Sequence, residues 1–182
     1  MRPDAGERCP ALVLVDGPSG SGKSTLADAL VRDGDAAAHL PPGAQLLRLD
    51  DVYPGWDGLE AASRHLEQHV LPGMRPGGRP RWRRWDWAAD APAEWHDLDP
   101  DRPVVVEGCG SLTRAAAALA THRIWVEADD DVRRARAIAR DGASFAVEWE
   151  RWDAQWRAHV AREDPRALAD AVVRTDAVAT PG

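Results

Sequence analysis

The chain has 182 residues, 44% of them hydrophobic and 29% charged, which suits one globular domain over 1–182 and is too short for two. A net charge of −7 argues against nucleic acid as the main partner, because neutralising phosphates requires a basic face. Two cysteines form neither a disulfide framework nor a metal-binding pattern, and no apolar stretch approaches membrane-span length, so we expect a cytoplasmic protein without a membrane partner.

Predicted strands and helices alternate along the chain. The strands are expected at 12–16, 45–49, 103–107, 123–127 and 171–174, and the helices at 24–31, 59–71, 112–120, 130–140 and 146–162. Residues 73–103, rich in Pro, Gly, Arg and Trp, are expected to be mostly irregular, and the ends 1–7 and 175–182 to fray. This alternation predicts an α/β fold with a parallel sheet covered by helices on both faces.

The segment 17–25 reads Gly-Pro-Ser-Gly-Ser-Gly-Lys-Ser-Thr and lies between the first predicted strand and helix, the context that a G-x-x-x-x-G-K-[ST] phosphate loop (P-loop) requires. Lys23 is the only lysine, and every other basic residue is arginine. A lysine is a slim point charge and arginine a planar fork, so a lysine kept only here indicates nucleoside triphosphate binding. The residues expected to bind the nucleotide are Gly17, Ser19, Gly20, Ser21, Gly22, Lys23, Ser24 and Thr25, with the Ser24 hydroxyl also on Mg²⁺.

The class of nucleotide protein can be narrowed by what the chain lacks. Guanine recognition through Asn-Lys-x-Asp needs a second lysine, and motor ATPases need further domains. A small-molecule kinase is the interpretation that we favour. The choice between ATP and GTP as the donor stays open, because a missing guanine motif is only weak support for adenine.

Further motifs follow in a fixed order. They are Asp50-Asp51-Val52-Tyr53, Trp85-Asp86-Trp87, Glu107-Gly108, the arginine-bearing segment 131–141, Gln155-Trp156 and the closing segment 169–173. In order and approximate spacing they resemble those of the uridine–cytidine kinases, in the uridine kinase and phosphoribulokinase group. The resemblance implies a P-loop NTPase fold with a five-stranded parallel sheet of order 2-3-1-4-5. It also implies an acceptor-side segment at about 53–100 and a short helical lid at about 133–147.

The same resemblance implies roles for individual residues. Asp50 would be the general base for the acceptor hydroxyl, and Glu107 would support Mg²⁺. Arg136 and Arg140 share a helix face and could reach the transferring phosphate. The residues expected to bind the acceptor are Asp50, Tyr53, Trp85, Asp86, Arg136 and Gln155.

Several alternatives stay open at this stage. Asp50 could be an ordinary turn residue, and Asp51 competes with it for the role of base. Trp149 and Trp152 have the spacing of a helix stripe that faces the core. A family histidine that reads the base has no match, with Asp90 near its place.

We therefore expect an enzyme that uses ATP and Mg²⁺ to phosphorylate a hydroxyl of a small molecule, with a nucleoside as the favoured acceptor. A non-nucleoside acceptor or a nucleoside monophosphate is the first alternative. A nucleotide-binding regulatory module with negligible turnover is the second. The sequence does not determine the oligomeric state, and a homo-oligomer is compatible with it.

Overall fold

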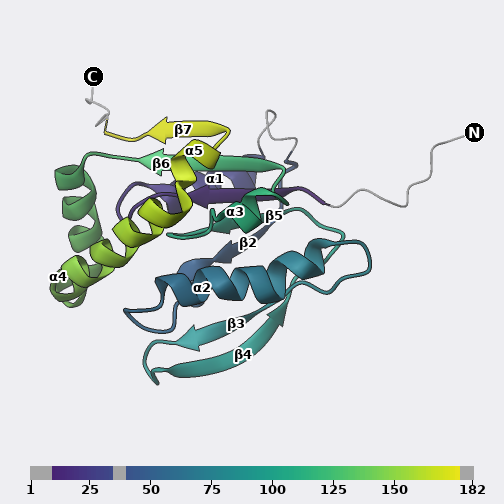
Figure 1. Ribbon diagram of the computed structural model, residues 1–182, viewed down its shortest axis with the longest axis horizontal. Coiled ribbons are helices and arrows are strands. Elements are labelled where there is room, and N and C mark those ends of the chain that lie inside the picture. Colours follow the sequence, from purple (N-terminus) through teal and green to yellow (C-terminus); the bar gives the residue numbers. More distant parts are fainter. Residues whose placement is uncertain (1–9, 35–39, 177–182) are drawn as a thin grey trace, which may run out of the picture.

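The computed structural model describes residues 10–34 and 40–176. Its centre is a five-stranded sheet in which all neighbouring strands are parallel (Figure 1). The strands are β1 (Leu12–Asp16), β2 (Gln45–Arg48), β5 (Val104–Glu107), β6 (His122–Glu127) and β7 (Ala171–Arg174). Their spatial order is β2-β5-β1-β6-β7, which is 2-3-1-4-5 when only the strands of this sheet are counted. The predicted order is thus confirmed.

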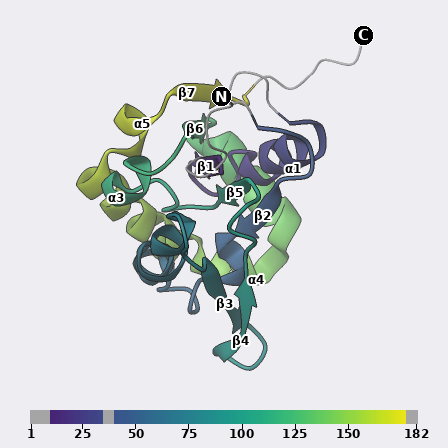
Figure 2. The same ribbon diagram turned by 90° about the vertical axis from the view of Figure 1, so that its right-hand side faces the viewer.

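The two faces of the sheet are buried against different helices. Alternation along β1 sends Leu12 and Leu14 to one face and Val13 and Val15 to the other, and all four are at most 2% exposed. The first face packs against the segment that begins with α2 (Leu59–His65) and against parts of α3 (Arg114–Ala117) and α4 (Asp130–Glu163). The second face packs against α1 (Lys23–Asp33), as the end-on view in Figure 2 shows. A short α5 (Pro165–Leu168) precedes β7.

Four helical elements differ from their expected bounds. The helix that begins with α2 continues as a π-helix, η2 (Leu66–Val70), and a 3₁₀ turn, η3 (Leu71–Met74). The expected helix at 112–120 is only α3, one turn long. The two helices expected at 130–140 and 146–162 form one run, α4, broken at Gly142, whose φ of 76° is left-handed. Figure 1 shows the two halves of α4 at an angle to each other, at one end of the molecule.

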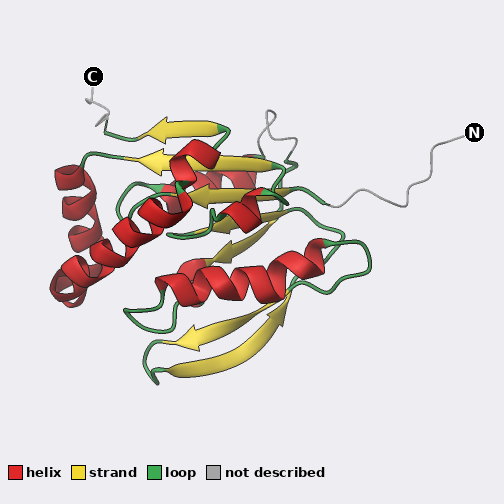
Figure 3. Cartoon of the chain, viewed as in Figure 1, coloured by secondary structure: helices red, strands yellow, loops and turns green. Residues whose placement is uncertain are grey.

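The expectation of a mostly irregular segment at 73–103 is wrong for residues 81–97. Residues 81–97 form an antiparallel hairpin of β3 (Arg81–Asp86) and β4 (Ala91–Asp97), separate from the main sheet (Figure 3). Its pattern is hard to recognise because both strands are partly exposed and carry charged and aromatic residues on either face. The hairpin lies beside α2, on the side away from the main sheet (Figure 1).

None of the helices in the described ranges has a stretch apolar and long enough to cross a membrane.

Candidate functional site

The P-loop wraps the amino end of α1. Gly20 has a φ of 78°, and a Cβ built on it would lie 1.9 Å from the carbonyl oxygen of Arg133. A Cβ on Gly17 would lie 2.0 Å from the carbonyl oxygen of Val126. Glycine is therefore required at both positions, because a neighbouring backbone carbonyl lies too close for a side chain. No side chain caps the first N–H groups of α1. Free N–H groups at a helix start form a site for phosphate oxygens.

Lys23 lies inside this loop and is only 7% exposed. Its ammonium donates to the carbonyl oxygen of Pro18 at 2.8 Å and lies 3.6 Å from the sulfur of Cys109. The charge is thus held inside the loop that the motif predicts to bind phosphates.

Ser24 and Glu107 meet at the carboxyl ends of the strands. The Ser24 hydroxyl donates to Glu107 Oε1 at 3.1 Å, and Glu107 is 2% exposed at the end of β5. Burial raises the pKa of the Glu107 carboxyl, while the nearby Lys23 opposes that shift. The described residues contain no group of three or more His, Cys, Asp or Glu side chains that could enclose a metal. The pair suits Mg²⁺, which keeps several waters and binds phosphates together with one or two protein oxygens.

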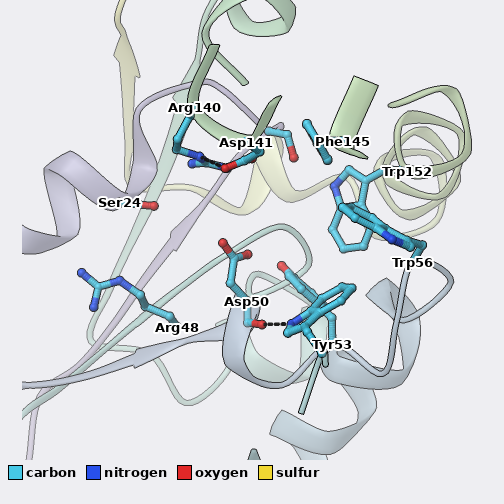
Figure 4. Close-up of a pocket in the computed structure, with 11 residues that line it drawn as sticks. Ser24, Arg48, Asp50, Tyr53, Trp56, Arg140, Asp141, Phe145 and Trp152 are labelled. Carbon is cyan, nitrogen blue, oxygen red and sulfur yellow. Dashed lines mark hydrogen bonds and ion pairs between the residues drawn. The ribbon is translucent and has the colours of Figure 1, made fainter. Parts of the chain in front are cut away.

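A cavity of about 400 Å³ opens beside this corner (Figure 4). It is lined by Ser19, Ser24, Arg48, Asp50, Tyr53, Trp56, Trp87, Arg140, Asp141, Phe145 and Trp152. Asp50 lies in the 3₁₀ turn η1 (Leu49–Asp51), directly after β2, and its carboxylate points into the cavity toward Ser24 and Arg140 (Figure 4). Asp51 is not among the lining residues, and burial together with the Asp50 charge raises its pKa. Of the two neighbouring aspartates, only Asp50 thus lines the cavity.

The two arginines expected to reach the transferring phosphate, Arg136 and Arg140, lie differently. Arg140 lines the cavity and donates two hydrogen bonds to Asp141, at 2.8 and 2.7 Å. Its pKa is raised first by Asp141, and also by Asp50 and Glu107. Arg136 instead donates to Thr175 at 3.0 and 2.7 Å.

Thr175 in turn donates to the carbonyl oxygen of Ser21 at 2.7 Å. The sequence predicts a frayed end at 175–182, but Thr175 is held by these hydrogen bonds. Residues 177–182 lie outside the described part. Arg136 and Thr175 support the P-loop from outside the cavity.

The residues expected from the sequence to bind the acceptor are only partly brought together in the structure. Tyr53 lines the cavity while its hydroxyl donates to the carbonyl oxygen of Cys109 at 2.9 Å. Trp85 lines a different hollow, between the hairpin and α2, and Asp86 accepts from the N–H groups of Ala88 and Ala89 at 3.0 Å each. The strand β3 ends at Asp86 after a register shift, so the ring that reaches the cavity belongs to the turn that follows.

That ring is Trp87, whose indole nitrogen donates to the Asp50 carbonyl oxygen at 2.9 Å. Gln155 does not line this cavity, because its amide donates to the carbonyl oxygen of Trp56 at 2.6 Å. Trp152 is buried as expected, at 5% exposed, yet it also forms part of the cavity wall. Trp87 had a sequence signal, because it belongs to the quoted Trp-Asp-Trp motif.

The sequence and the fold of the chain were compared with those of known proteins. No protein-family model matches the chain. In sequence it is 32% identical over 144 residues to a tRNA dimethylallyltransferase of Cereibacter sphaeroides, a match that takes in 75% of this chain and 43% of that protein. The chain thus spans less than half the length of that curated relative.

In structure the chain is similar to a possible uridine kinase from Bacillus stearothermophilus, with a TM-score of 0.59, 16% identity, and coverage of 93% of this chain and 90% of that one. It is also similar to a protein from a Silicibacter species described as a fructose transport system kinase, with a TM-score of 0.53, 20% identity, and coverage of 93% and 92%. Identities this low show a shared fold. Together with the P-loop after β1 and the sheet order, they establish that the chain has the P-loop NTPase fold in the form that these proteins share.

Proposed function

We propose that the protein transfers the γ-phosphoryl group of ATP to a hydroxyl of a small molecule, with a nucleoside such as uridine as the favoured acceptor. One observation carries the proposal. Ser24 of the P-loop, which donates to the buried Glu107, lines the same cavity as Asp50 and Arg140 (Figure 4).

Each residue has a chemical task in this proposal. The free N–H groups at the start of α1 and the Lys23 ammonium bind the phosphates. Ser24 and Glu107 would hold Mg²⁺, directly or through water, and the ion would neutralise charge on the β- and γ-phosphates. Asp50 takes the proton of the acceptor hydroxyl as the new P–O bond forms and the bond to ADP breaks. Arg140 exchanges Asp141 for the transferring phosphate, since a guanidinium binds either group.

The walls of the cavity favour an acceptor with a ring. Five aromatic side chains line the part beyond Asp50: Tyr53, Trp56, Trp87, Phe145 and Trp152. Trp56 lies 5.2 Å from Trp87 and 5.5 Å from Phe145, measured between ring centroids. Aromatic surfaces of this kind bind flat rings by stacking or by edge-to-face contact.

The test is phosphoryl transfer from γ-labelled ATP to a panel that contains uridine, cytidine, uridine monophosphate, sugars and a metabolite extract. The proposal expects one labelled alcohol ester with wild-type protein and none with Lys23→Ala, whose fold is checked by circular dichroism. Tight ATP binding without any labelled product would support a regulatory nucleotide-binding module instead. Full activity of the Lys23→Ala protein would refute the assignment.

A second candidate is favoured by one observation, the sequence match to a tRNA dimethylallyltransferase. That reaction modifies a nucleic acid, whereas the present chain has a net charge of −7. Incubation with tRNA and a dimethylallyl diphosphate donor separates the two. Dimethylallylated tRNA would establish the second candidate.

A further inference from the structure

Among the described side chains that line the cavity, Trp152 is the one with a buried polar atom that has no hydrogen-bond partner. It lies in the second half of α4, is 5% exposed, and lines the cavity. Its indole nitrogen is buried and makes no hydrogen bond. The neighbouring Trp87 provides the contrast, because its nitrogen donates to the Asp50 carbonyl oxygen at 2.9 Å.

The Trp152 ring is held in place by its neighbours. It packs edge-on against Tyr53, with 4.7 Å between ring centroids, and against Trp56 at 6.4 Å. Figure 4 shows its nitrogen on the edge of the ring toward the interior of the cavity, near Phe145. A buried N–H without an acceptor is costly. A ligand that supplies an acceptor there, with a small side-chain shift, removes that cost.

Charge around the cavity indicates which kind of ligand fits. The arginines among the lining residues are Arg48 and Arg140, both on the phosphate side and both already paired with carboxylates. The aromatic side has no cation among its lining side chains in the described ranges. A ligand part that enters between these rings is therefore uncharged, which disfavours an acceptor with its own phosphate there.

We propose that Trp152 determines acceptor specificity: its indole N–H donates a hydrogen bond to an acceptor atom on the base, such as a carbonyl oxygen, of an uncharged, nucleoside-like alcohol. This inference rests on the proposed function and assigns the recognition of the acceptor ring to a residue that sequence spacing places in the core. Asp50 and Trp152 lie at different sides of the cavity (Figure 4), so one molecule can offer its hydroxyl to the first and its ring to the second.

The test compares two probes that differ only in the ring. Uridine carries two carbonyl oxygens on its base that can accept a hydrogen bond, whereas β-ribosylbenzene keeps the ribose and a flat ring but has no acceptor on that flat ring. Binding of each probe is measured by calorimetry with ADP and Mg²⁺ present. Trp152→Phe removes the N–H and keeps an aromatic ring. Trp149→Phe is the matched control, because Trp149 is also 5% exposed, lies one turn earlier on α4, and is not among the lining residues.

Wild-type protein and Trp149→Phe should prefer uridine over β-ribosylbenzene. Trp152→Phe should bind uridine about tenfold more weakly, bind β-ribosylbenzene as before, and so lose the preference. With uridine as substrate, KM should rise while kcat stays within about twofold, as expected for lost uniform binding.

An unchanged preference in Trp152→Phe, or an equal loss in Trp149→Phe, would overturn the role of Trp152. Wild-type protein that ignores uridine and cytidine but phosphorylates a sugar of the panel would overturn ring recognition and leave the phosphoryl transfer of the proposed function standing. Failure of the proposed function itself is distinct, because no member of the panel would then be phosphorylated.

Discussion

Arg133 offers a sharp test of how the two halves of α4 are held together. It is 2% exposed, and its guanidinium donates to Asp130 in the first half at 2.8 Å and to Asp153 in the second half at 2.7 Å. It also lies over the rings of Trp149 and Trp156, at 5.0 and 5.1 Å from their centroids. Arg133→Met keeps most of the side-chain volume and removes the charge.

The loss of stability expected for Arg133→Met follows from how deeply each of its carboxylate partners is buried. Removing one member of a buried ion pair costs about 3–5 kcal/mol. The Asp153 side chain is 12% exposed and keeps a second partner, Arg157, at 2.6 Å, so the low end applies. Asp130 is 68% exposed and adds little. We expect a loss of about 3 kcal/mol in the free energy of unfolding. At about 2–4 °C per kcal/mol for a chain of this size, Tm falls by roughly 6–12 °C.

The assay is urea and thermal unfolding followed by circular dichroism. Arg157→Met is the matched control, because Arg157 contacts the same two carboxylates but is 57% exposed, and its loss should cost less than about 1 kcal/mol. Equal losses in the two variants, or a loss below about 1 kcal/mol for Arg133→Met, would refute the idea that this buried charge joins the halves.

Three further outcomes follow. Burial raises the pKa of Glu107, so the apparent affinity for Mg²⁺ during turnover should weaken as pH falls through that raised value. Glu107→Gln should need about 10- to 100-fold more Mg²⁺ and lose this pH dependence, and an unchanged profile in the variant would count against the metal role. Burial, with His69 and Arg83 nearby, lowers the pKa of His65 to about 4. The unfolded chain therefore binds this proton at a higher pH than the folded protein, and stability should fall as pH drops from about 6.5 toward 4. An NMR titration midpoint near 6.5 for this ring would contradict this expectation. Gly142→Ala should cost about 1 kcal/mol in urea unfolding because φ is 76° while a Cβ would meet nothing within 4 Å, and an unchanged midpoint would show that the break in α4 does not need glycine.

The sheet and the P-loop could be predicted because their signals are local. The strand β1 is an apolar run that ends at a glycine-rich loop, and the buried run Val104–Glu107 has the same form. Once the P-loop fixes the first strand and helix, right-handed crossovers leave few orders for the rest. The hairpin at 81–97 could not be predicted in this way, because its strands are only partly buried and the alternation of apolar residues along them is weak.

The arrangement of the residues expected to bind phosphate and Mg²⁺ was easier to predict than that of the residues expected to bind the acceptor. Glu107 ends β5, Asp50 comes just after β2, and Lys23 and Ser24 begin α1 after the loop that follows β1. The carboxyl ends of parallel strands meet at one edge of the sheet. The acceptor wall instead depends on where a strand ends and which way a turn points. Neighbouring rings of one motif, Trp85 and Trp87, therefore line different hollows.

The proposed chemistry depends on the carboxylate of Asp50. Asp50→Asn preserves the shape of the side chain and removes its ability to take the hydroxyl proton, while Asp51→Asn changes the adjacent carboxylate, which does not line the cavity. With the alcohol identified in the panel, single-turnover phosphoryl transfer should slow by about 10²- to 10⁴-fold in Asp50→Asn, with ATP affinity unchanged, and stay near wild type in Asp51→Asn. Transfer within about tenfold of wild type in Asp50→Asn, or an equal loss in Asp51→Asn, would contradict the mechanism.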